Sequence, residues 1–138
     1  MSRSTGRTWK VAAATLVPLT FVLTACGDSN RPQVCDDFDS LHKSVADLRS
    51  TSLNSDGVNA LQTNVSKVKS DLQTFAQSAK GQFSTQLNAL NLAISQATTA
   101  ISGAVGKTSP QSLAAAGSAL RGAGTAFQSL EDAVNDTC

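Results

Sequence analysis

Apolar residues recur along residues 34–134 at alternating spacings of three and four. This spacing places them on one face of an α-helix, and such a face has to be buried against another element of the fold. No stretch of the sequence shows the strict alternation or the cluster of β-branched residues that is typical of a strand. The pattern therefore predicts an all-α fold.

The apolar positions form four sets that are separated by helix-breaking residues. The sets are Val34, Phe38, Leu41, Val45 and Leu48; Val58, Leu61, Val65, Val68, Leu72, Phe75 and Ala79; Phe83, Leu87, Leu90, Ile94, Ala97 and Ile101; and Leu113, Ala116, Leu120, Ala123, Phe127, Leu130 and Val134. Residues 50–57 separate the first two sets, and Ser109 with Pro110 is typical of an N-cap followed by the first helical residue. Four apolar stripes are buried most simply in an up-and-down four-helix bundle, which we predict for residues 34–138.

The boundary between the second and third sets is the weakest, because Lys80-Gly81-Gln82 contains a single helix breaker. A tight turn there produces the four-helix bundle. A helix that continues through Gly81, at a cost of about 1 kcal/mol, instead produces a long central helix flanked by two shorter helices. We expect the turn because a bundle shields both faces of the apolar seam, and the long helix is the alternative.

The first twenty-five residues have the features of a signal peptide. Three basic residues and no acidic residue precede an apolar run at residues 11–23, which Pro18 interrupts. A charged start followed by a short apolar run is typical of export signals. The run is shorter than the roughly twenty apolar residues that a membrane-spanning helix needs. We therefore predict that residues 1–25 are a cleaved signal peptide.

The apolar run ends in Leu23-Thr24-Ala25-Cys26, which resembles the lipobox of bacterial lipoproteins. The resemblance implies cleavage before Cys26 and acylation of this cysteine with fatty acyl chains such as palmitate. The protein would then be anchored to the cell membrane on its extracytoplasmic face, with residues 26–33 as a short tether. The alternative is an ordinary secretory peptide that leaves Cys26 as a free thiol.

The rest of the sequence has a second, looser resemblance. A cysteine opens the first predicted helix, SVADL lies within that helix, GVNALQTNVSKVKSDLQ follows it, and a cysteine ends the sequence. This layout is similar to small exported helical proteins of actinobacteria. Most of these carry no assigned activity, so the resemblance transfers no functional residue.

Two cysteines remain once Cys26 is lipidated. Disulfides persist outside the cytoplasm, and Cys35 and Cys138 allow one intramolecular bridge. In an up-and-down bundle of four helices the start of the first helix and the end of the last lie at the same end, although the long-helix alternative also brings them together. We predict a Cys35–Cys138 disulfide that stabilises the fold by roughly 4 to 5 kcal/mol. The alternative is a free or intermolecular Cys138 thiol.

Composition and charge argue against several functional classes. All ten acidic residues follow Cys26 but only eight of the eleven basic ones do, so residues 26–138 have a net charge of −2. A nucleic-acid surface needs clustered Lys and Arg, which this sequence lacks. His42 is the only histidine and has no second histidine with which to bind zinc, and the abundant serines lack a neighbouring base. We expect no enzyme activity, no metal and no cofactor.

Asp36, Asp37 and Asp39 form the densest acidic cluster. They fall in the first turn of a predicted helix, where the helix dipole favours negative charge, so we expect them to cap that helix.

Two functions are consistent with these features of the sequence. The first is a non-catalytic envelope lipoprotein that presents a helical domain to a partner protein or to the cell wall. The alternative is a small-molecule-binding lipoprotein with an apolar cavity between its helices. The last predicted helix is rich in alanine and contains Gly117, Gly122 and Gly124, and these small residues leave room for such a cavity.

Overall fold

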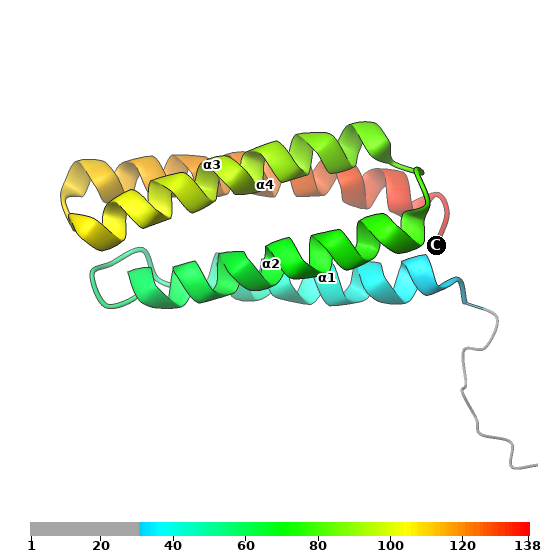
Figure 1. Cartoon of the computed structure of the whole chain (residues 1–138), viewed down its shortest axis with the longest axis horizontal. Helices are drawn as coiled ribbons and strands as arrows, with labels where there is room; N and C mark the ends of the chain where they lie inside the picture. Colours follow the sequence, from blue (N-terminus) through cyan, green and yellow to red (C-terminus); the bar gives the residue numbers. More distant parts are fainter. Residues whose placement is uncertain (1–30) are drawn as a thin grey trace, which may run out of the picture.

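A computed structural model describes residues 31–138 as four helices that run alternately up and down (Figure 1). The helices are Gln33–Ser50 (α1), Val58–Ala79 (α2), Ser84–Gly106 (α3) and Pro110–Asn135 (α4). Within this part of the chain there is no strand. The predicted all-α four-helix bundle is confirmed. The expected signal peptide, the lipidated Cys26 and most of the tether lie outside the described residues.

The four helices are not packed equally closely against one another. α1 packs along α2, and α3 packs along α4, so that the bundle consists of two helix pairs (Figure 1). α2 and α3 join the pairs along one side. α1 and α4 approach each other closely at few positions, and the seam between them is the loosest in the bundle.

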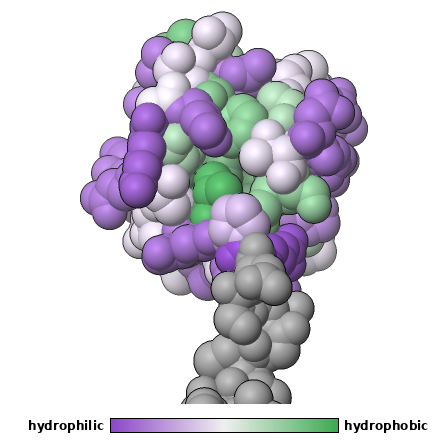
Figure 2. Space-filling view, turned by 90° about the vertical axis from the view of Figure 1, so that its right-hand side faces the viewer, coloured by the Kyte–Doolittle hydropathy of each residue, from purple (hydrophilic) through white to green (hydrophobic). Residues whose placement is uncertain are grey.

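The apolar stripes predicted from the spacing form the core. All members of the first two sets are buried, as are most members of the other two. The exceptions are partly buried and pack against the edge of the core: Phe83, Leu87, Leu113 and Leu120. Viewed from the end that carries the start of α1 and the end of α4, apolar residues gather at the centre and hydrophilic residues surround them (Figure 2).

A tight turn separates α2 from α3, and the long-helix alternative is wrong. Lys80, Gly81 and Phe83 all have positive φ angles, of 49°, 88° and 60°. Glycine adopts this conformation freely, whereas each of the other two residues loses about 1 kcal/mol by it. The ring of Phe83 stacks on Phe75 with 6.1 Å between centroids, and this contact offsets part of that loss.

The other two connections are also determined locally. In the loop between α1 and α2, a Cβ atom on Gly57 would lie 2.0 Å from the carbonyl oxygen of Ser52, so only glycine fits there. Ser109 is the N-cap of α4 and forms a capping box with Ser112, with Pro110 at the start of the helix. The predicted start of the fourth helix is therefore confirmed.

Candidate functional site

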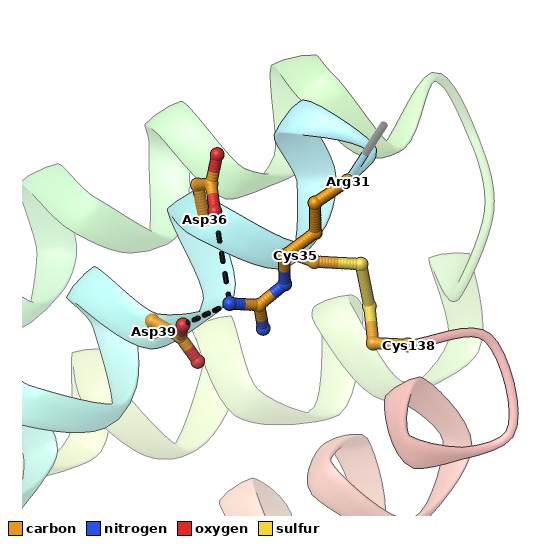
Figure 3. Close-up of a disulfide and its surroundings, with 5 residues drawn as sticks. All are labelled: Arg31, Cys35, Asp36, Asp39 and Cys138. Atoms are coloured by element: carbon orange, nitrogen blue, oxygen red, sulfur yellow. Dashed lines mark hydrogen bonds and ion pairs between the residues drawn. A yellow bond between two sulfur atoms is a disulfide. The ribbon is translucent and has the colours of Figure 1, made fainter. Parts of the chain in front are cut away.

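The disulfide closes the α1–α4 seam at one end of the bundle (Figure 3). Cys35 lies in the first turn of α1, Cys138 lies just beyond α4, and their Cα atoms are 5.9 Å apart. Cys35 is fully buried. The predicted Cys35–Cys138 bridge is thus present, at the end of the bundle where the chain enters α1.

Two members of the acidic cluster, Asp36 and Asp39, pair with Arg31 beside the disulfide, and no side chain caps the start of α1. The Nη1 atom of Arg31 lies 2.8 Å from an Asp39 carboxylate oxygen and 3.7 Å from one of Asp36 (Figure 3). The N-cap residue is Pro32, and its side chain makes no capping hydrogen bond. The expectation that these aspartates cap α1 was therefore wrong as regards side-chain hydrogen bonds, although Asp36 does lie in the first turn. Among residues 31–138, no group of three or more His, Cys, Asp and Glu side chains is placed to bind a metal ion.

Aromatic residues fill the next part of the seam. The rings of Phe38 in α1 and Phe127 in α4 stack with centroids 5.7 Å apart and an interplanar angle of 7°. His42 packs on Phe127, and its Nε2 atom lies 3.6 Å from a carboxylate oxygen of Glu131. The His42 side chain is 51% exposed. These side chains bridge the two helices.

Beyond the aromatic contacts the seam opens into a groove, which we call the α1–α4 groove. It has a volume of about 430 Å³. Its walls come from the end of α1, the loop that follows it and the middle of α4: Leu48, Arg49, Thr51, Leu53, Gly117, Leu120, Arg121, Gly124, Thr125 and Gln128. A volume of about 300–1,000 Å³ is usual for small-molecule sites, so the groove is large enough to bind one.

The floor of the groove reaches toward the core of the bundle. A smaller cavity of about 20 Å³ adjoins it and shares four of its lining residues. This cavity also touches Leu90 and Ile94 of α3, both of which are buried. Leu120, which is partly buried, lines both the groove and this cavity.

Two glycines of α4 create the space. Gly117 and Gly124 are seven residues apart and therefore lie on the same face of the helix. A Cβ atom on Gly117 would lie 3.3 Å from Cδ1 of Leu53, and a Cβ atom on Gly124 would meet nothing within 4 Å. Gly122 lies outside the groove. The sequence indicated a glycine-rich helix, but only the structure identifies which glycines face α1.

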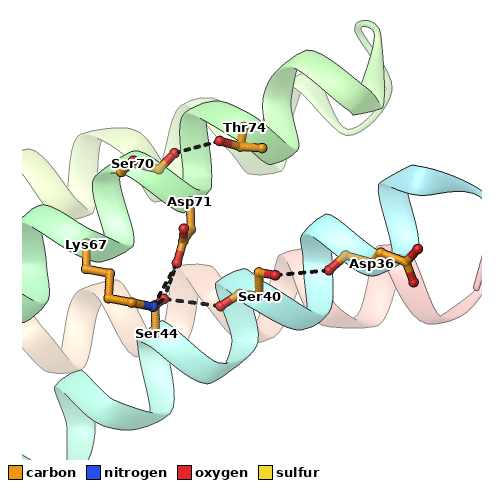
Figure 4. Close-up of polar contacts among 7 residues, drawn as sticks. All are labelled: Asp36, Ser40, Ser44, Lys67, Ser70, Asp71 and Thr74. Carbon is orange, nitrogen blue, oxygen red and sulfur yellow. Dashed lines mark hydrogen bonds and ion pairs between the residues drawn. The ribbon is translucent and has the colours of Figure 1, made fainter.

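A polar cluster between α1 and α2 was missed by the sequence analysis (Figure 4). Ser44 is 1% exposed, its hydroxyl donates to Asp71, and Nζ of Lys67 donates to the Ser44 oxygen at 2.6 Å. Lys67 also pairs with Asp71 at 3.3 Å. The available signal was the position of Ser44 on the apolar stripe, three residues after Leu41 and four before Leu48.

Some hydrolases pair a nucleophilic serine with a lysine, so the chemistry of this cluster has to be considered. Burial separates the Ser44 hydroxyl from any substrate, and Lys67 is an ammonium donor toward both of its neighbours. The cluster therefore links α1 to α2 and holds the two helices in register. The α1–α4 groove is the better candidate for a functional site.

The helices α1 to α4 are each too short or too polar to cross a membrane. No protein-family model, curated protein or solved structure matches this chain.

Proposed function

We propose that this protein is a non-catalytic envelope lipoprotein, anchored to the cell membrane through a lipid on Cys26, whose bundle binds a small molecule in the α1–α4 groove. The observation that carries the binding function is the groove of about 430 Å³ with an apolar floor. Small-molecule sites are typically concave and mostly apolar, with a few polar groups. The α1–α4 groove combines an apolar floor with polar side chains on its walls.

The N-terminal sequence and the disulfide support a location outside the cytoplasm. Leu23-Thr24-Ala25-Cys26 resembles a lipobox, and disulfides persist in oxidising compartments. Acyl chains on Cys26 would hold the bundle at the membrane without a spanning helix.

A second candidate function is docking to a partner protein or to the cell wall. Leu53, in the loop after α1, and Val105, near the end of α3, are each 42% exposed. Both lie at the end of the bundle opposite the disulfide (Figure 1). These apolar side chains would favour contact with a partner at the end of the domain that is remote from the anchor.

The experiment that tests the binding function uses a neutral fluorescent probe, N-phenyl-1-naphthylamine, whose emission rises in apolar sites. The protein is the full mature chain with Cys26→Ser, secreted without lipid so that no detergent competes for the groove. In the same cells the wild-type protein should partition with membranes and the Cys26→Ser form should not. We expect the Cys26→Ser form to bind the probe with saturable fluorescence.

Gly124→Leu and Gly122→Leu are matched variants in this experiment. Each adds the same side chain to α4, and a Cβ atom at either position meets nothing within 4 Å. Only Gly124 lines the groove, so Gly124→Leu should abolish probe binding while Gly122→Leu retains it. Absence of saturable binding, or equal effects of the two variants, would contradict the proposal.

A further inference from the structure

Two arginines line the α1–α4 groove from opposite walls. Arg49 belongs to α1 and Arg121 to α4. Neither takes part in any ion pair found within residues 31–138. Nη2 of Arg121 donates to the Ser118 hydroxyl at 3.2 Å, which leaves its charge uncompensated. Two guanidinium groups at one groove in a domain of net negative charge favour an anionic ligand.

The floor between these arginines is apolar. Leu48 and Leu120 line both the groove and the small cavity that adjoins it. That cavity extends to Leu90 and Ile94 in the core. A small inorganic anion would contact the arginines and leave this floor exposed to water. A ligand that uses both features has an acidic head and an apolar body.

We propose that the α1–α4 groove binds a single-chain anionic amphiphile of the fatty-acid class. The carboxylate is held by Arg49 and Arg121, and the acyl chain lies on Leu48 and Leu120. This inference rests on the proposed function, in which the groove binds a small molecule. The planar guanidinium group suits the head group, because it binds a carboxylate through two parallel hydrogen bonds.

The position of the groove favours a diffusible amphiphile over a lipid within the bilayer. α1 rises by about 1.5 Å per residue, so Arg49 lies about 24 Å along the helix from Gln33. The groove therefore lies toward the end of the bundle opposite the start of α1, the end to which the proposed anchor at Cys26 is connected. This separation from the anchored end of the bundle favours a ligand that has left the membrane.

The test compares dodecanoate with dodecan-1-ol as competitors for N-phenyl-1-naphthylamine bound to the Cys26→Ser form of the mature chain. The two ligands have the same number of carbons and differ in head-group charge. Because a charged hydrogen-bonded pair is stronger than a neutral one, dodecanoate should displace the probe at about tenfold lower concentration.

Three charge variants sharpen the test. Arg49→Gln and Arg121→Gln should each weaken dodecanoate binding about tenfold and leave dodecan-1-ol unaffected. Lys43→Gln is the control, because Lys43 is an exposed residue of α1 that does not line the groove. It also removes one positive charge from α1 and should bind dodecanoate like the parent protein. Thermal melts by circular dichroism establish that each variant is folded.

The outcomes distinguish this inference from the proposed function. If the probe binds but dodecanoate and dodecan-1-ol displace it equally in all variants, the groove binds apolar molecules and the anionic ligand class is wrong. If inorganic phosphate at the same concentrations blocks the binding of dodecanoate, the groove is a site for small anions and the proposed amphiphilic ligand class is wrong. If neither the probe nor dodecanoate binds, the proposed function fails and the inference fails with it.

Discussion

The seam between α1 and α4 is closed in one half and open in the other, although the same two helices form both. Near the disulfide, Phe38 stacks on Phe127 and His42 approaches Glu131. Toward the other end, Gly124 faces open space and a groove of about 430 Å³ separates the helices. Phe127 and Gly124 are less than one helical turn apart.

Side-chain volume therefore decides where this seam closes. The backbones of α1 and α4 approach closely at few positions, so large side chains have to bridge the distance between them. Aromatic rings and a disulfide do so in one half. Glycines leave the other half unfilled, and substitutions in either half test this explanation.

Removal of the disulfide should cause the greatest loss of stability. In the Cys35→Ser, Cys138→Ser double variant, the free energy of unfolding should fall by about 4 kcal/mol, because the bridge closes a loop of about a hundred residues in the unfolded chain. Chemical denaturation followed by far-UV circular dichroism measures the change. Reduction of the wild-type protein should reproduce it, and a loss below about 1 kcal/mol would show that packing alone closes this half.

Two alanine variants compare the stability contributed by the aromatic half of the seam with that contributed by the groove half. Phe127 is 2% exposed, so Phe127→Ala should lower the free energy of unfolding by about 3 kcal/mol. Leu120 is only partly buried, so Leu120→Ala should lower it by about 1 kcal/mol. Denaturant titrations of both variants test the comparison. Equal losses would mean that the groove half is packed as tightly as the aromatic half.

The smallest of these changes is a gain in stability. Gly124→Ala should raise the free energy of unfolding by about 0.5 to 1 kcal/mol, because alanine favours the helix and its Cβ atom meets no neighbour. Gly57→Ala is the contrasting change, since its Cβ atom would lie 2.0 Å from the carbonyl oxygen of Ser52, and it should destabilise the protein. Paired thermal melts compare the two. A destabilising Gly124→Ala would mean that α1 and α4 pack closely at this position.

Much of the fold could be predicted from the sequence, because helix periodicity and turn chemistry are local. The spacing of apolar residues identified the buried face of each helix, and Ser109 with Pro110 marked the start of α4. The turn around Gly81 was predicted on the weaker ground that a bundle buries more surface.

The groove could not be predicted in the same way. Periodicity identifies the face of a helix that is buried, but it does not specify how closely two faces approach each other. Gly124 lies on the apolar stripe, four residues after Leu120 and three before Phe127, and Gly122 does not, but only the packing shows that Gly124 lines a groove. Arg49 and Arg121 lie off the apolar stripes and are far apart in the sequence, so the fold alone brings their charges to one site. Ser44 was missed because its partners, Lys67 and Asp71, lie on another helix.

The disulfide has a mechanical consequence when the domain is pulled at its ends. Cys35 and Cys138 enclose almost the whole of the four helices in one covalent ring. Tension applied between the two ends of the domain passes from one cysteine to the other through the sulfur–sulfur bond, and the helices within the ring carry none of it. The bundle therefore resists unravelling by pulling at its ends for as long as that bond stays oxidised.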